Sequence, residues 1–133
     1  MTQYAEKCEV PVGQEPRCFV ADSLPAEAAC TNVDGFTVVG DNLLILQWKD
    51  GQDLSASERA LFERITAQCP ATVMIIVGDA EAMTVNSLRV ARQGQIGPCE
   101  SADLESVRNA IRKWSAWALA NPAVRRHQEV SWN

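Results

Sequence analysis

Three polar side chains, a carboxylate, an amide and an ammonium, stand at spacings that could bring them together on one face of a sheet. Asp34 opens a β-prone run, and Gln47 and Lys49 lie at the end of a second, apolar run. An aspartate with a second oxygen ligand can hold a hard divalent cation such as Mg²⁺. A lysine beside them can orient the water that attacks a phosphodiester, or stabilise the charge that develops there. These residues form the candidate catalytic set.

A β-hairpin must position this set. The first run, the turn-forming cluster and the second run cover residues 33–39, 40–42 and 43–49. Two β-prone runs around such a cluster predict antiparallel strands. A loop of two or four residues would pair Asp34 with Gln47 or with Lys49, and directly opposed residues point to the same face. A three-residue loop would instead place Asp34 opposite Trp48.

A crossover helix and a parallel strand are predicted to follow the hairpin. Ser55 and Glu58 have the spacing of a capping box at the start of a helix over residues 55–68, and Pro70 marks its end. A short apolar run over residues 72–77 comes next. Strand, helix and strand within about 30 residues form a right-handed crossover unit with parallel strands.

The second half of the chain predicts more strands and one long helix. Residues 83–85 and 88–92 are expected to form two short strands, and residues 93–98 a loop. Ser101 is expected to cap a helix over residues 101–120, which carries one apolar stripe.

Length and hydropathy predict one domain without a membrane span. The 133 residues suit a single α/β (α+β) domain, with a mixed β-sheet, a central hairpin, a parallel crossover strand and packed helices. Residues 1–26 are expected to be an irregular N-terminal segment and residues 121–133 a C-terminal tail. No apolar run approaches the roughly 20 residues that span a bilayer. No signal-peptide pattern is present, so a cytoplasmic location is expected.

The charge distribution disfavours nonspecific binding to nucleic acid. The net charge is −5, and residues 1–60 carry ten acids against four bases. Because phosphate neutralisation supplies nonspecific affinity, DNA or RNA would have to meet a local basic patch. Arg108, Arg112 and Lys113, on or near one side of the last predicted helix, are the candidate phosphate contacts.

Five cysteines leave a zinc site open as a minor alternative. An odd number without a secretion signal argues against a disulfide framework. Three early cysteines with one later one could supply four thiolates for zinc, although no Cys-x-x-Cys pair occurs. The simpler interpretation is that they are small buried apolar residues. They are Cys8, Cys18, Cys30, Cys69 and Cys99.

The hairpin and crossover pattern resembles the core of the PD-(D/E)XK nuclease superfamily. The resemblance rests on Asp34, a thirteen-residue step, Gln47-x-Lys49 at the end of an apolar strand, and then a helix and another apolar strand. The text Asp34-Gly35-Phe36 and Leu44 to Gly51 is similar to that of small nuclease-like proteins encoded by bacteriophages. The resemblance covers about residues 27–79 and implies a restriction-endonuclease-like core.

The resemblance implies a Mg²⁺-dependent phage or prophage nuclease acting on DNA or RNA in a bacterial host cell. Asp34 would be the metal-binding acid, Gln47 would occupy the (D/E) position and Lys49 would be the catalytic lysine. Glu27 would be a further metal ligand, which stands for an acid that many members carry on a helix before the core. Gln47 is an amide, as in some members of the family, so it removes one negative charge from the metal site.

Two alternatives come from other functional classes. The fold could be retained without catalysis, as a binding module or an inhibitor of a host protein. The chain could also be a small structural zinc protein. The sequence leaves the oligomeric state open.

Overall fold

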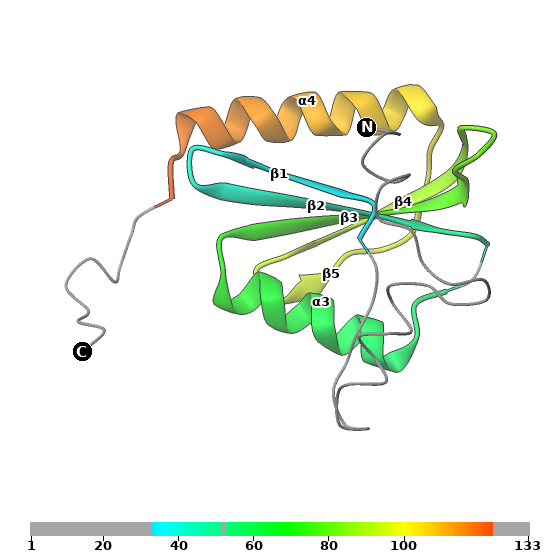
Figure 1. Cartoon of the computed structure of the whole chain (residues 1–133), viewed down its shortest axis with the longest axis horizontal. Coiled ribbons are helices and arrows are strands. Elements are labelled where there is room, and N and C mark those ends of the chain that lie inside the picture. Colours follow the sequence, from blue (N-terminus) through cyan, green and yellow to red (C-terminus); the bar gives the residue numbers. More distant parts are fainter. Residues whose placement is uncertain (1–32, 52, 124–133) are drawn as a thin grey trace, which may run out of the picture. The chain divides into compact units, whose positions relative to one another are not determined.

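The computed structural model describes residues 33–51 and 53–123. Within them a mixed six-stranded sheet is covered by one helix on each face (Figure 1). This confirms the expected α+β class with a mixed sheet. Glu27, the predicted irregular segment 1–26 and the tail beyond residue 123 lie outside the described residues. The elements are β1 (Gly35–Val39), β2 (Asn42–Lys49), α3 (Ala56–Gln68), β3 (Ala71–Asp79), β4 (Thr84–Arg92), β5 (Gln95–Ile96), β6 (Glu100–Ser101) and α4 (Leu104–Ala120).

The hairpin of β1 and β2 closes through a two-residue turn. Gly40 and Asp41 both have positive φ, 56° and 63°, which is the backbone of the hairpin turn that matches strand twist. Val39 pairs with Asn42 and the register continues to Gly35 opposite Leu46. Of the loop lengths left open by the sequence, the structure has two residues, so Asp34 lies on the same face as Gln47 and Lys49.

The crossover unit is also confirmed. β2 and β3 are parallel neighbours, joined by α3. The helix begins with the predicted capping box: the Ser55 hydroxyl accepts from the Glu58 amide, and the Glu58 carboxylate accepts from the Ser55 amide. β3 has neighbours on both sides and is buried from Ala71 to Ile76, which explains its unbroken apolar run.

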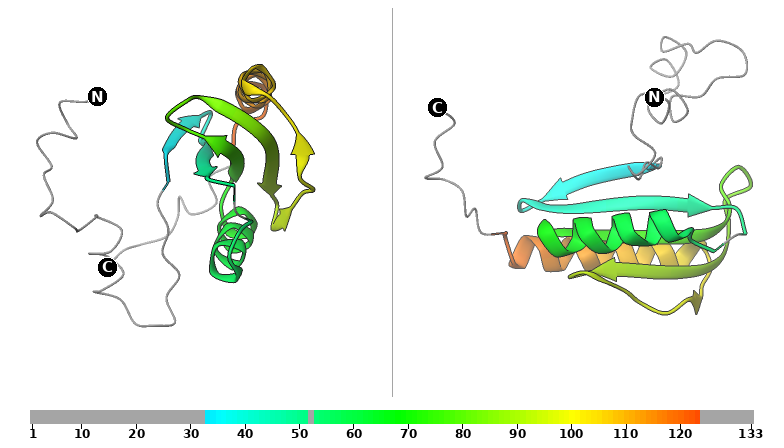
Figure 2. Two further views of the ribbon diagram at one scale, coloured as in Figure 1. Left: turned by 90° about the vertical axis from the view of Figure 1, so that its right-hand side faces the viewer. Right: turned by 90° about the horizontal axis from the view of Figure 1, so that it is seen from below.

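Two apolar clusters divide the core between the faces of the sheet. Figure 2 shows α3 and α4 on opposite sides of the strands. Because side chains alternate along a strand, odd-numbered residues of β2 point toward α3 and even-numbered ones toward α4. We call these sides the α3 face and the α4 face. The α3 face holds Ile45, Phe62, Val73, Ile75 and Ala91. The α4 face holds Leu44, Met74, Trp114 and Ala118.

Three predictions for the second half are wrong in detail. Residues 84–92 form one strand, β4, because the whole stretch pairs with β3 across a single register shift at Val77/Gly78. The predicted loop 93–98 contains the two-residue strand β5. Ser101 does not cap α4, because it lies in β6, where its backbone pairs with Ser87 of β4.

The N-cap of α4 is Asp103. Its carboxylate accepts from the Ser106 amide at 2.8 Å, and the Ser106 hydroxyl lies 3.3 Å from the Asp103 amide. This is a capping box of the same kind as the one that opens α3. Its acidic residue stands at the N-cap, where it also favours the positive end of the helix dipole.

Two further expectations can be compared with the described residues. No helix there has the length and apolar character needed to cross a membrane. Cys69 and Cys99 are exposed, so the interpretation of the cysteines as buried apolar residues is wrong for these two. Both stand where strands and helices meet loops, and neither enters an apolar cluster. The other three cysteines lie outside the described residues.

Candidate functional site

Asp34 makes hydrogen bonds to β2 at the residues directly before and after Gln47. Its backbone amide donates to the Leu46 carbonyl at 2.9 Å, and its Oδ2 accepts from the Trp48 amide at 2.7 Å. The side chain thus replaces a backbone partner where the β1 ladder ends. The register of the hairpin places Asp34 level with Gln47, one of the two pairings that an even loop allows. Within the described chain, Oδ1 makes no hydrogen bond, so it is available to a ligand.

Gln47 is buried on the α3 face, and its carbonyl oxygen has no partner. Only 6% of the residue is exposed. Its Nε2 donates to the Trp48 carbonyl at 3.5 Å, while Oε1 is buried without a hydrogen bond among the described residues. An unpaired buried acceptor of this kind costs about 1–3 kcal/mol, so proteins rarely leave one without a function or a bound partner.

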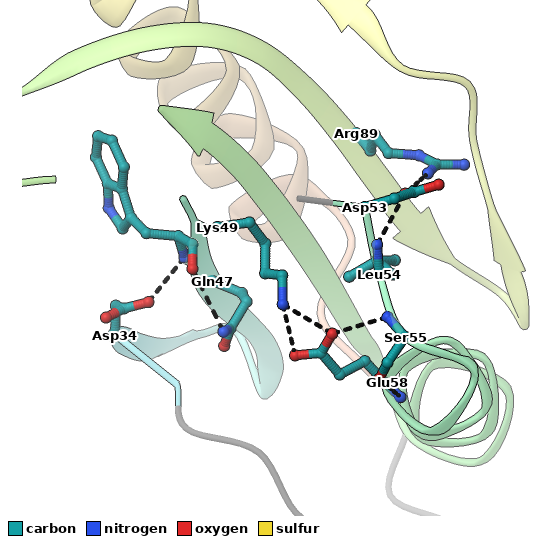
Figure 3. Close-up of polar contacts among 9 residues, drawn as sticks. Asp34, Gln47, Lys49, Asp53, Leu54, Ser55, Glu58 and Arg89 are labelled. Atoms are coloured by element: carbon teal, nitrogen blue, oxygen red, sulfur yellow. Dashed lines mark hydrogen bonds and ion pairs between the residues drawn. The ribbon is translucent and has the colours of Figure 1, made fainter. Parts of the chain in front are cut away.

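Lys49 is held by a carboxylate from α3. Its Nζ lies 2.8 Å and 3.0 Å from the two carboxylate oxygens of Glu58, and both side chains are largely buried, with 18% and 14% exposed. Glu58 Oε1 also accepts from the Ser55 amide at 3.0 Å. Figure 3 shows Lys49 reaching from β2 to the first turn of the helix. Glu58 therefore joins the site and anchors the helix start with the same group.

The structure gathers four residues, which we call the hairpin site: Asp34, Gln47, Lys49 and Glu58 (Figure 3). Sequence reasoning used Glu58 only as a capping residue. A signal for its second role existed in the crossover itself. A right-handed strand–helix–strand unit returns the helix over the strand that precedes it, so the first turn of α3 must lie near the end of β2.

The predicted phosphate contacts do not join the hairpin site. Arg108, Arg112 and Lys113 are exposed on α4, which covers the opposite face of the sheet. Arg112 Nη1 lies 3.2 Å from Glu105 Oε2, and Arg108 Nη1 lies 3.7 Å from Glu105 Oε1. This shared acid offsets part of their charge, so they form a weaker anion-binding patch than their sequence spacing suggests.

The donor set of the hairpin site suits a hard cation in part. In the described residues no three of the usual acidic, histidine and cysteine ligands gather in one place. Two carboxylates and an amide oxygen lie around the end of β2, in Asp34, Glu58 and Gln47 (Figure 3). Mg²⁺ takes oxygen ligands and commonly needs only one or two carboxylates, with water and substrate phosphate supplying the rest. The unpartnered Oε1 of Gln47 is the observation that favours such a ligand.

Comparison with known proteins adds no relative. No family model, no curated protein and no solved structure matches the chain. The chemistry of the hairpin site therefore has to be argued from its own residues.

Proposed function

We propose that this chain is a metal-dependent phosphodiesterase of the PD-(D/E)XK type, encoded by a phage or prophage, which acts on DNA or RNA with Mg²⁺. The observation that carries the proposal is the buried, unpartnered Oε1 of Gln47, level with Asp34 and two residues before Lys49. A metal ligand would satisfy that oxygen.

Each residue of the hairpin site has a role in this proposal. Asp34, Gln47 and Glu58 would hold the cation through oxygen atoms, and the cation would polarise the phosphodiester and the attacking water. Lys49 would orient that water or stabilise charge on the phosphate. Glu58 keeps the ammonium in place beside Gln47 until substrate arrives.

The topology supports a restriction-endonuclease-like core. The Asp34 hairpin, the crossover helix and the parallel strand β3 follow one another in the order that the resemblance implies, and helices cover both faces. The site lies where β2 ends, next to the N-terminus of α3. In open α/β sheets, ligands bind outside the carboxyl ends of the strands.

A cleavage assay tests the proposal. The full chain is incubated with plasmid, single-stranded DNA and RNA in the presence of Mg²⁺ or Mn²⁺. We expect cleavage that Lys49→Ala lowers about 10²–10³-fold, the usual cost of removing one charge-stabilising donor. Arg64→Ala, which removes an exposed cation of α3 outside the hairpin site, is the matched control. Absence of cleavage on every substrate, or full activity of Lys49→Ala, would overturn the proposal.

A second candidate is a nuclease-like fold that binds a host protein without cutting. Both carboxylate oxygens of Glu58 engage Lys49, and Gln47 contributes no charge. The site therefore binds a cation more weakly than a site with a carboxylate at position 47 and a Glu58 that does not pair with lysine. Purification of the tagged chain from bacterial lysate should then return one partner at stoichiometric yield. Recovery of the chain alone would count against this candidate. The zinc alternative is tested by metal analysis of protein purified without chelators.

A further inference from the structure

A cavity of about 220 Å³ lies on the α3 face, beyond the start of α3. Its apolar lining comes from Leu54, Ile75 and Val77, and its polar lining from Asp53, Ser87 and Arg89. We call it the Arg89 cavity. Clefts that enclose drug-sized ligands measure roughly 300–1,000 Å³, so this one suits a single ring system.

Arg89 gives the cavity a fixed cation. Its Nε donates to the Gly97 carbonyl at 3.1 Å and its Nη1 to Asp53 Oδ1 at 3.0 Å, and 15% of the side chain is exposed. A guanidinium has five N–H donors. Contacts with the described residues use two of them, so three remain for water or a ligand. Arginine cannot shed its charge, so these donors require acceptors.

Asp53 places an acceptor beside those donors. Its Oδ1 also accepts from the Leu54 amide at 2.8 Å, which fixes the carboxylate at the cavity rim. A phosphate would meet the repulsion of this carboxylate. Arg89 and Asp53 already pair with each other, but an aliphatic ligand would use neither the remaining guanidinium donors nor the second carboxylate oxygen. A flat, uncharged ring with a donor and an acceptor on adjacent edge atoms satisfies both groups and packs its faces on Leu54, Ile75 and Val77.

The Arg89 cavity adjoins the hairpin site. A continuous set of contacts runs from Lys49 to Glu58, from Glu58 to the Ser55 amide, and along the chain to Asp53 and Arg89 (Figure 3). A substrate whose phosphate reaches Lys49 therefore has a neighbouring group within reach of the cavity.

We propose that the Arg89 cavity binds one unpaired nucleobase of a single-stranded or locally opened nucleic acid. Bases carry donors and acceptors side by side along their edges, and proteins read extruded bases by edge hydrogen bonds and packing on apolar side chains. The inference rests on the proposed function for its substrate class. It goes beyond that function by selecting unstacked bases over intact duplex.

Nucleoside binding to the metal-free full chain tests the cavity separately from cleavage. The probes are guanosine, adenosine, cytidine and uridine, with ribose 5-phosphate as the control for sugar and phosphate. ¹H–¹⁵N NMR spectra should show saturable shifts at the Arg89 Nε–H and the Val77 and Ser87 amides. A ligand of this size should bind with a Kd on the order of millimolar.

Ser87→Leu should fill the cavity and weaken nucleoside binding at least about tenfold, a loss of roughly 1.4 kcal/mol. Thr37→Leu adds the same side chain at an exposed position of β1 and should leave binding unchanged. If Ser87→Leu unfolds, the smaller Ser87→Val replaces it.

The outcomes separate the two proposals. Equal shifts with ribose 5-phosphate, no shifts with any nucleoside, or full binding by a folded Ser87 variant would overturn the cavity proposal. Nucleoside binding without any cleavage would leave the cavity proposal standing and remove the enzyme. Preferential cleavage of single strands that Ser87→Leu abolishes would support both.

Discussion

At Gln47, metal binding and protein stability favour different side chains. A carboxylate at position 47 would hold a cation more tightly, but it would be an isolated buried charge whenever the cation was absent. The amide keeps an oxygen at the same place without that penalty. Its unpartnered Oε1 still makes the position costly unless a ligand or a water molecule donates to or coordinates it.

Gln47→Glu should therefore trade stability for metal affinity. We expect Mn²⁺ binding to strengthen about tenfold, because one more negative charge faces the cation. Without metal, the free energy of unfolding should fall by about 1–3 kcal/mol, because burial disfavours a charged carboxylate. Electron paramagnetic resonance titration and urea unfolding with and without metal measure the two effects.

Gln47→Leu is the matched control, since it removes the oxygen at similar volume. It should abolish metal binding while unfolding at the same urea concentration or a higher one. Unchanged Mn²⁺ affinity in both variants would contradict a role for this side chain as a ligand.

Among the site residues, sequence reasoning placed Asp34 and Gln47 correctly but missed Glu58 as a partner of Lys49. The period of two along a strand decides which residues share a face, so the first two could be predicted once the turn length was chosen. The crossover brings the first turn of α3 near the end of β2, but the Lys49–Glu58 contact also depends on how the helix packs on the sheet, where Phe62 enters the core. Local sequence patterns do not encode that packing.

At the scale of elements, the Gly40–Asp41 turn ties the hairpin to the end of α4. The Gly40 carbonyl accepts from the Ala123 amide at 2.8 Å, and Asn42 Nδ2 donates to the Asn121 carbonyl at 2.9 Å. A Cβ on Gly40 would lie 2.6 Å from the Ala118 carbonyl oxygen. The turn is therefore packed against the helix, and glycine is required by both its φ and its surroundings.

Gly40→Ala should lower the free energy of unfolding by about 1–3 kcal/mol, from left-handed strain and the displacement of the end of α4. Urea unfolding followed by tryptophan fluorescence measures the loss. Gly51→Ala, at a glycine whose φ is also positive (76°) but whose Cβ would meet nothing within 4 Å, is the control and should lose less. A loss as small as that of the control would contradict the packed turn.

Asp103 makes the stability of the N-terminus of α4 depend on pH. The hydrogen bond from the Ser106 amide, with a further one from the Ser106 hydroxyl, lowers the pKa of this carboxyl from its ordinary value of 3.8. Its folded pKa is the lower one, so its contribution to stability is complete above 3.8 and is lost as the pH falls through the folded pKa.

Asp103→Asn should retain the cap but lose this pH dependence, because asparagine caps helices about as well without a titrating group. The difference in urea midpoint between wild type and variant should be largest at neutral pH and shrink as the pH falls below 3.8. A constant difference across that range would show that ionisation of Asp103 does not stabilise α4.

Long periodic elements could be predicted, and short paired segments could not. The hairpin, α3 and β3 follow from turn chemistry, a capping box and an apolar run. β5 and β6 have two residues each and exist only because β4 offers them a partner. The pairing of β6 with β4 includes Ser101, which therefore cannot cap α4. Because β6 was not predicted, the start of this helix was predicted too early.

For the domain as a whole, β1 is an edge that the described residues leave unpaired on one side. Its sequence is uncharged, and Phe36 and Val38 are 69% and 58% exposed on the α3 face. Exposed apolar edge strands template pairing with other chains unless a charge or a covering segment prevents it.

Val38→Lys should raise the concentration at which the protein aggregates on heating, with stability changed by no more than about 0.5 kcal/mol. Light scattering during a thermal ramp and urea unfolding measure the two quantities. Val73→Lys, at a fully buried position, is the contrasting variant and should prevent folding. Unchanged aggregation in Val38→Lys would show that this edge does not mediate it.

Glu58 makes the first turn of α3 a reporter of events at β2. One carboxylate holds both the Lys49 ammonium and the Ser55 amide, so a ligand that draws it away leaves that amide to solvent. Amide hydrogen exchange at Ser55 should accelerate when the site is loaded, while exchange in the middle of β3 should stay slow. Occupancy could then be followed through the loosening of a helix end.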